Sequence, residues 1–252
     1  MQKSMKGRQA SPVVDPVRNE LLAALLATEY RRLLPKLEHV TLKGGDIVYR
    51  ADQKIEQVYF PEDAVIAMVD TADNASTVEV GIIGHEGFVG INIFLGGAIT
   101  PDKAIVQLPG GAFTMKSRDL RKEIRFGSPL QRLLLDYTRT FLAVISQSVA
   151  CSQHHDVTQR LARWLLTMND YAGAGEFLMF HDSMAAMLGV RRVSVTDAAH
   201  ALRAHGLISY QRGRINVLDK AGLGKKSCEC YRFINKEYET LYGAVPKLLS
   251  GR

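Results

Sequence analysis

Two adjacent arginines open a segment of small and polar side chains, RRVSVTDAAHALR, at residues 191–203. Its apolar residues recur at helical spacing and predict one buried face. The other face could contact DNA, because an arginine can donate two hydrogen bonds to guanine and hydroxyl groups suit phosphates. The segment predicts a helix in the major groove, with a helical hairpin bearing solvated arginines as the alternative. The candidate DNA-binding residues here and just beyond are Arg191, Arg192, Val193, Ser194, Thr196, Asp197, His200, Arg203, Arg212 and Arg214.

The elements around this segment have the order of a winged helix–turn–helix unit. MAAML predicts a preceding helix, and Gly189 predicts the tight turn between the two helices. LISYQ and RINVL predict two short strands around Arg212-Gly213-Arg214, which form the wing. Upstream, Asp156 is expected to cap a further helix.

The first half of the chain has a different character. Residues 18–36 predict a short helix that stops near Pro35, after a polar tail at residues 1–17. From about 38 to 117, runs rich in Val, Ile, Tyr and Phe alternate with turn signals. This pattern predicts an all-β sandwich or roll.

A long helix is expected to follow the β segment, starting at Pro129, a residue suited to a first helical turn. Along it, apolar residues recur at alternating steps of three and four, as in a coiled-coil seam. The stripe predicts either a dimer interface with a second copy or a helix face packed in the core. The candidate dimer residues are Leu134, Tyr137, Phe141, Val144, Ser148 and Cys151.

The composition limits the function classes. The 252 residues carry a formal net charge of +6, which fits a polyanionic partner. The apolar runs are shorter than the roughly 20 residues that cross a bilayer, so we expect a cytoplasmic protein without membrane contact. The three cysteines indicate a reducing compartment rather than a disulfide framework. Cys228 and Cys230 are expected to point in different directions and to pack, with no metal site; metal binding or oxidation is the alternative.

The order of elements resembles the Crp/Fnr family, the cyclic-AMP receptor and fumarate–nitrate regulators of bacteria. The stretches that carry the resemblance are GDIVYRADQKIEQVYFPEDAVIAMVD, GHEGFVG, DVTQRLARWLL and MAAMLGVRRVSVTDAAHALRAHGLI. It implies an α+β fold with an N-terminal double-stranded β-roll (a jelly-roll, cyclic-nucleotide-binding-like), a long dimerisation helix and a C-terminal winged helix–turn–helix. The implied parts are a tail at 1–17, the roll at 18–128, the dimerisation helix at 129–153, the DNA-binding domain at 154–225 and a C-terminal helix at 226–252.

The resemblance also implies function: a homodimeric transcription regulator on a pseudo-palindromic, double-stranded DNA operator. By position, Arg192, Val193 and Asp197 fall on the base-reading sites, and Arg191 and Ser194 fall on the phosphate sites. An activator of this kind would also contact RNA polymerase, although no motif marks such a surface.

The effector is a separate question. The positions that match the family's nucleotide site are Gly90, Ile91, Asn92 and Lys103. Cyclic-AMP binders have a Gly-Glu pair and an Arg-Ser pair there, so the sequence does not favour a cyclic nucleotide. It does not favour an iron–sulfur cluster either, because no cysteine precedes Cys151. A haem ligand stays open among the histidines His39, His85, His154 and His155.

Two other classes remain as alternatives. A cupin-like metal enzyme needs several clustered ligands on adjacent strands, whereas His85-Glu86 stands alone. No nucleophile with its base is visible, so we do not expect an enzyme. A helix–turn–helix that binds protein is the other alternative.

Overall fold

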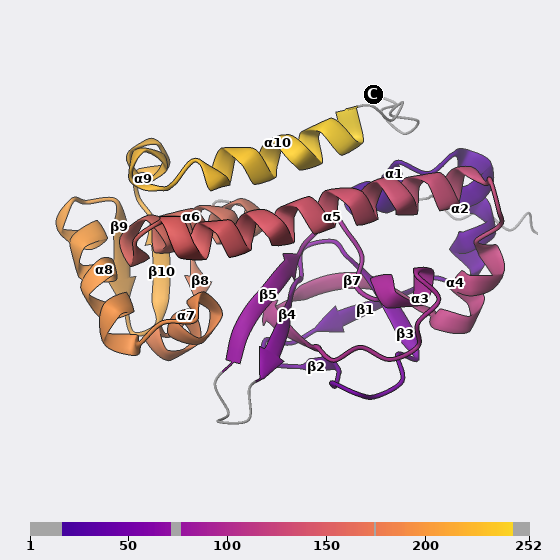
Figure 1. The fold of residues 1–252 in the computed structure, drawn as a ribbon, viewed down its shortest axis with the longest axis horizontal. Coiled ribbons are helices and arrows are strands. Elements are labelled where there is room, and N and C mark those ends of the chain that lie inside the picture. The colour runs from indigo at the N-terminus through magenta and orange to yellow at the C-terminus, as the bar shows by residue number, and fades with distance from the viewer. Residues whose placement is uncertain (1–16, 72–76, 174, 244–252) are drawn as a thin grey trace, which may run out of the picture.

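The computed structural model describes residues 17–71, 77–173 and 175–243. It comprises a β-roll, one long helix beside it, and a C-terminal domain of helices and a small sheet (Figure 1). The chain enters the roll through α1 (Glu20–Ala23), α2 (Ala27–Leu33) and the 3-10 helix η1 (Leu34–Lys36). Among the described residues, no helix combines the length and apolar character that a membrane crossing requires.

The roll consists of two antiparallel sheets. One has the order β1-β7-β3, and the other has the order β2-β6-β4-β5. The strands are β1 (Glu38–Leu42), β2 (Ile47–Tyr49), β3 (Gln57–Pro61), β4 (Val65–Thr71), β5 (Thr77–Ile83), β6 (Lys103–Leu108) and β7 (Gly110–Lys116), with the short helices α3 (Ile91–Phe94) and α4 (Ser117–Glu123). Phe60 on β3 stacks on Phe88 in the core, with ring centroids 5.7 Å apart. The predicted β-roll is confirmed.

Helix α5 (Pro129–His154) runs along the roll and on to the C-terminal domain (Figure 1). Ser128 caps its start by accepting a hydrogen bond from the backbone N–H of Gln131. The ring of Tyr137 packs against Phe88 of the roll core, and the ring of Phe141 stacks on Tyr137.

This packing corrects the expected dimer seam. Most of the heptad stripe faces the protomer's own interior, because the roll and α10 cover it. Leu134, Tyr137, Phe141, Val144 and Cys151 are buried, and Ser148 is half-buried. A different position of the heptad repeat is exposed: Leu135, Leu142 and Val149 have 51%, 59% and 62% of their surface accessible.

The C-terminal domain has the expected winged helix–turn–helix order. It consists of α6 (Val157–Tyr171), β8 (Phe177–Leu178), α7 (His181–Leu188), α8 (Arg192–Ala204), β9 (Ile208–Gln211), β10 (Arg214–Val217) and α9 (Lys220–Lys226). The three strands form one sheet in the order β8-β10-β9. Asp156 begins α6 with a capping box: its side chain accepts from the N–H of Gln159, whose own side chain accepts from the N–H of Asp156.

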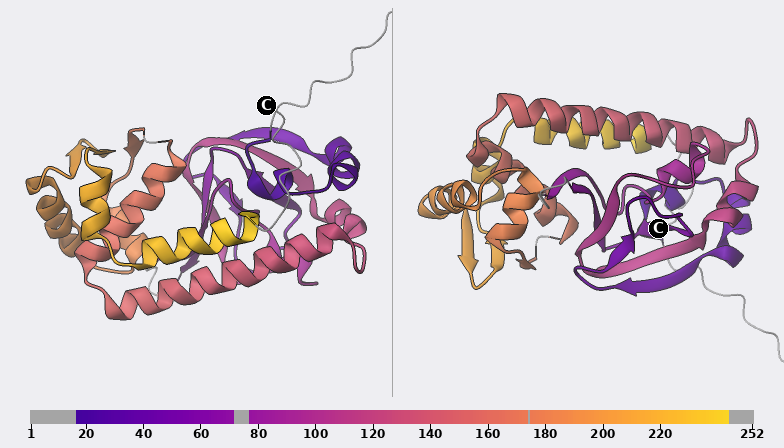
Figure 2. Two further views of the ribbon diagram at one scale, coloured as in Figure 1. Left: turned by 90° about the horizontal axis from the view of Figure 1, so that it is seen from above. Right: turned by 60° about the horizontal axis from the view of Figure 1, so that its bottom comes forward.

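The last helix, α10 (Cys230–Gly243), returns along α5 toward the roll (Figure 2). Near its end, the Tyr242 hydroxyl donates a hydrogen bond to the carbonyl of Glu86. Glu86 belongs to the loop that follows β5 in the roll. Helix α10 therefore connects the C-terminal domain back to the roll.

Candidate nucleic-acid interface

The turn between α7 and α8 has a regular helix-ending geometry. Gly189 adopts the left-handed conformation with φ 63°. Its N–H bonds to the carbonyl of Ala186, and the next N–H, of Val190, bonds to the carbonyl of Ala185. This pair of bonds is a Schellman motif, which glycine accommodates without strain. The sequence signal at Gly189 therefore located the turn correctly.

Helix α8 buries the face that the periodicity predicts. Val195, Ala198, Ala199 and Leu202 are at most 4% exposed and pack into the core of the domain. The small alanines let α8 cross closely over α6 and α7. The opposite face is thereby fixed toward solvent.

The first turn of α8 is open to a ligand. Arg191 is the N-cap residue and makes no side-chain capping bond. Arg191, Arg192 and Val193 are all exposed, whereas Ser194 is half-buried. The guanidinium Nε of Arg192 lies 3.2 Å from Asp182 Oδ1, and both side chains are mostly exposed. Such an exposed ion pair is weak, so Arg192 can exchange it for another anion.

Thr196 has a structural partner that sequence analysis did not identify. The Thr196 hydroxyl donates a hydrogen bond to the carbonyl of Arg192. The Nδ1 of His181 lies 2.9 Å from this hydroxyl oxygen, Thr196 Oγ1. The His181 ring also stacks on Tyr210 of the wing, with centroids 4.5 Å apart. Burial and the positive charge of Arg192 lower the pKa of His181. His181 thus joins α8 to the wing through contacts between residues that are distant in the sequence.

The remaining candidate residues spread over the same side of the domain. Asp197, His200 and Arg203 are exposed along α8. At the wing, Arg212 adopts φ 51° in the turn and is exposed. Arg214 is partly engaged, because its Nη1 lies 2.9 Å from Glu176 Oε1. A groove lined by Arg203, Arg212 and Arg214 lies between α8 and the wing.

Residues 159–226 match the family model of the Crp-like helix–turn–helix domain. This part of the chain is a Crp-like helix–turn–helix domain. The match covers α6 to α9, so it includes every candidate DNA-binding residue. Comparison of the sequence with curated proteins gives no significant match.

About three quarters of the chain is similar in fold to solved regulators of the Crp/Fnr type. FixK2 from Bradyrhizobium japonicum has a TM-score of 0.65 and 16% identity, over 76% of this chain and 98% of that one. A CRP-family transcriptional regulator from Thermus thermophilus has a TM-score of 0.63 and 16% identity, over 75% and 96%. The c-di-GMP-responsive regulator CLP from Xanthomonas campestris has a TM-score of 0.60 and 15% identity, over 76% and 99%. These likenesses show the fold, and they confirm the resemblance at that level.

The candidate effector residues lie in the roll, away from the Crp-like domain. Gly90 has φ 115° and begins α3, where an added Cβ would lie 2.7 Å from Val58 Cγ1. Ile91 is buried, and Asn92 donates a long hydrogen bond of 3.5 Å to the carbonyl of Ile99. Lys103 is half-buried on β6. Packing within the roll explains the residue types at Gly90 and Ile91. The contacts of these four residues do not identify a ligand.

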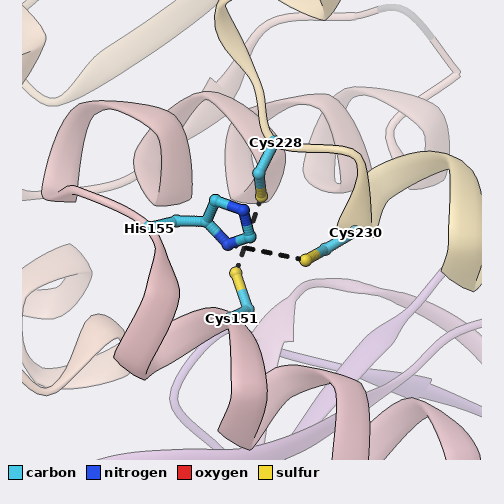
Figure 3. Close-up of side chains that lie close together, drawn as sticks. All are labelled: Cys151, His155, Cys228 and Cys230. Atoms are coloured by element: carbon cyan, nitrogen blue, oxygen red, sulfur yellow. Dashed lines mark hydrogen bonds between the residues drawn. The ribbon is translucent and has the colours of Figure 1, made fainter.

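A second group of side chains meets where α5 ends. Cys151, His155, Cys228 and Cys230 converge there, although their two pairs lie far apart in the chain (Figure 3). This overturns the expectation that Cys228 and Cys230 point apart: Cys228 precedes α10 in a loop and Cys230 is its first helical residue, so both thiols reach one point. The thiol hydrogen bond with Cys228 lowers the pKa of Cys151, and the same contact raises the pKa of Cys228.

Proposed function

We propose that the protein is a homodimeric transcription regulator of the Crp/Fnr type that binds double-stranded DNA through α8. The observation that carries this proposal is the exposed first turn of α8 on a Crp-like helix–turn–helix domain. Backbone N–H groups at a helix start suit phosphate, and Arg191 adds a positive charge beside them. A regulator of this kind acts in the cytoplasm and is not an enzyme.

Base reading is assigned to the first two turns of α8. Arg192 and Val193 are exposed there, and Asp197 follows one turn later. The Arg192 guanidinium would bind guanine, Val193 would contact a thymine methyl group, and Asp197 would accept from cytosine. Arg191 and Ser194 would hold phosphates, as would Arg212 at the wing. Because a carboxylate only accepts hydrogen bonds, Asp197 would favour cytosine, whose amino group donates one, at its position.

The dimer is assigned to the outer face of α5. Leu135, Leu142 and Val149 are spaced by seven residues and together form an exposed apolar stripe. Two copies paired along this stripe would form a short coiled coil. The two α8 helices would then enter successive major grooves, about one helical turn apart, on a pseudo-palindromic operator.

The effector does not need to be a cyclic nucleotide. Gly90 and Ile91 are held by packing, and the site offers Lys103 where cyclic-AMP binders have an arginine. A cyclic phosphate is bound best by a guanidinium with further donors. We infer that the protein binds its operator without cyclic AMP. An activating role would require RNA polymerase as an additional partner.

The test is selection of bound DNA from a random pool, without ligand and then with cyclic AMP. A palindromic motif from the ligand-free protein is the expected result. The Arg191→Ala/Arg192→Ala double variant should lose this motif while staying folded and dimeric. The matched control is Arg118→Ala, which removes an exposed arginine from α4 of the roll. No motif under either condition, or equal binding by the double variant, would contradict the proposal.

A further inference from the structure

Four potential metal ligands converge where α5 ends. Cys151 lies in the last turn of α5, and His155 is the C-cap residue of that helix. Cys228 and Cys230 come from the loop and first residue at the start of α10. Their sulfur and nitrogen atoms all lie within 4.8 Å of one another (Figure 3).

The spacing of these atoms suits one tetrahedral ion. The Sγ atoms of Cys151 and Cys228 are 3.6 Å apart, and the Nδ1 of His155 is 3.7 Å from Cys230 Sγ. In a tetrahedral site with Zn–S bonds of about 2.3 Å, neighbouring sulfurs lie roughly 3.8 Å apart. An iron–sulfur cluster would place several atoms between its ligands and need a wider opening. Three thiols and one imidazole are also a ligand set typical of structural zinc.

The surroundings of the ligands have the features of a metal site. The Nε2 of His155 lies 3.2 Å from Glu229 Oε1, which leaves Nδ1 as the free ring nitrogen. A carboxylate on the far nitrogen is the usual way in which a metal-binding histidine is oriented. Gln147 donates a hydrogen bond of 3.1 Å to Cys230 Sγ from the neighbouring turn of α5. Glu229 and Gln147 thus fix two of the four ligands from outside.

Two arginines lie near the buried thiols. The three cysteines are at most 3% exposed, so anionic sulfur there needs a compensating charge. Arg160 and Arg163 on α6 are near enough to Cys151 to interact with it electrostatically and could supply that charge. The Nε of Arg163 is buried and has no hydrogen-bond partner within the described part of the chain. Three thiolates with Zn²⁺ would leave one net negative charge for these arginines to balance.

We propose that Cys151, His155, Cys228 and Cys230 bind one Zn²⁺ ion. The ion ties the end of α5 to the start of α10, across the point where α5 passes into the Crp-like domain at Asp156. Because α5 carries the exposed dimer stripe, the ion would hold each DNA-binding domain in a fixed orientation on the dimer helix. This consequence rests on the proposed function, whereas the metal site does not.

The first experiment measures the metal in the full chain purified under reducing conditions. We expect about one zinc per chain by elemental analysis, and an intense thiolate-to-cobalt absorption band when Co²⁺ replaces Zn²⁺. His155→Ala should lose the stoichiometric zinc. The matched control is His154→Ala, which removes the adjacent, exposed histidine and should retain it. Circular dichroism of both variants separates loss of metal from loss of fold.

A second variant tests whether Glu229 positions His155 for metal binding. Glu229→Gln keeps the size of the side chain but removes the carboxylate, so zinc affinity measured against a competing chelator should fall by roughly 10–100-fold. Folded, reduced wild-type protein without zinc and without the cobalt band would overturn the proposal. So would the absorption of an iron–sulfur cluster, or a Cys151–Cys228 disulfide that persists in reductant. None of these readouts uses DNA, so a failed operator selection leaves them unaffected.

A final measurement tests the orienting role. Once an operator is known, its affinity is compared before and after removal of zinc by a chelator. Weaker binding that Zn²⁺ restores supports the role. Unchanged binding by the zinc-free dimer would overturn the orienting role and leave the metal site standing.

Discussion

The indole Nε1 of Trp164 donates a 3.2 Å hydrogen bond to Oε2 of Glu79. Trp164 lies on α6 of the Crp-like domain, and Glu79 lies on β5 of the roll, so the bond joins the two. Burial raises the pKa of Glu79, while the indole N–H favours its charged form. A second contact lies nearby, where Val78 packs close to Gly189 of the helix–turn–helix turn. Residues of β5 therefore contribute directly to the orientation of the two domains within one protomer.

Removing the acceptor at Glu79 should weaken this interface. Glu79→Leu leaves the buried indole N–H of Trp164 without a partner, which costs about 1–3 kcal/mol. Urea unfolding of the full chain should show the loss. Glu79→Gln is the control, since its amide oxygen can still accept and should keep most of the stability. Equal stability of the Leu and Gln variants would show that the bond does not form in solution.

Arg212 at the wing tip should contribute to DNA binding through charge alone. Arg212→Ala removes one phosphate contact, so the slope of log K against log salt should decrease in magnitude by about one. The preference among operator sequences should stay the same.

Arg192→Ala should instead relax the preference at one base position, with a loss of about 1–3 kcal/mol in binding free energy for the preferred base. Fluorescence anisotropy with a labelled operator measures both effects, and a salt slope unaffected by Arg212→Ala would contradict the assignment.

A charge on the outer face of α5 should separate the dimer. Leu142→Glu places two carboxylates opposite each other at the centre of the apolar stripe, where repulsion and desolvation both oppose association. Sedimentation equilibrium should give a monomer in place of the wild-type dimer. Leu95→Glu is the control, because Leu95 is equally exposed, at 59%, but lies in the roll. A dimer that persists in Leu142→Glu would place the interface elsewhere.

Glu86 should make the protein less stable as the pH rises. Glu86 is 3% exposed, and its Oε2 has no hydrogen-bond partner among the residues that the structure describes. Burial raises the pKa of Glu86 above the ordinary value of 4.5. The folded state therefore holds its proton more tightly than the unfolded chain. The contribution of Glu86 to the free energy of unfolding is complete below the pKa of the unfolded chain. Above that pH it falls by about 1.4 kcal/mol per pH unit, until the pKa of the folded state is reached.

Glu86→Gln cannot ionise and should remove this dependence. The stability of the variant relative to wild type should therefore increase as the pH rises above 4.5, which urea unfolding at a series of pH values measures. Glu56→Gln is the control, since Glu56 is 72% exposed. Parallel pH curves for Glu86→Gln and wild type would contradict the raised pKa.

The sequence predicted the parts of the fold that depend on local signals. The Schellman turn at Gly189, the capping box at Asp156 and the buried face of α8 each depend on residues within one or two turns of helix. The order of the elements followed from these signals. The pairing of strands did not, because the neighbour of β1 is β7, far along the chain.

The sites that were misassigned depend on distant contacts. A heptad stripe indicates that a helix face is buried but does not indicate what buries it. Tyr137 and Phe141 pack in the core of the roll, so they are not available to a second copy. The metal ligands were missed for the same reason. Cys151 and Cys228 are 77 residues apart, and the loop before α10 turns both cysteines of the Cys-Glu-Cys segment the same way. Sequence spacing gives no information on either point.

Helix α10 has a mechanical consequence for any switch in this protein. It starts beside the junction of α5 with the Crp-like domain and ends against the roll, where Tyr242 meets Glu86 (Figure 2). The roll and the Crp-like domain are thus connected by two helices that lie side by side, α5 and α10. The Crp-like domain cannot swing about Asp156 unless α10 slides along α5 or detaches from it. A signal that acts on the roll therefore has two helical routes to the Crp-like domain, through α5 and through α10, in addition to the direct contacts that β5 makes with that domain.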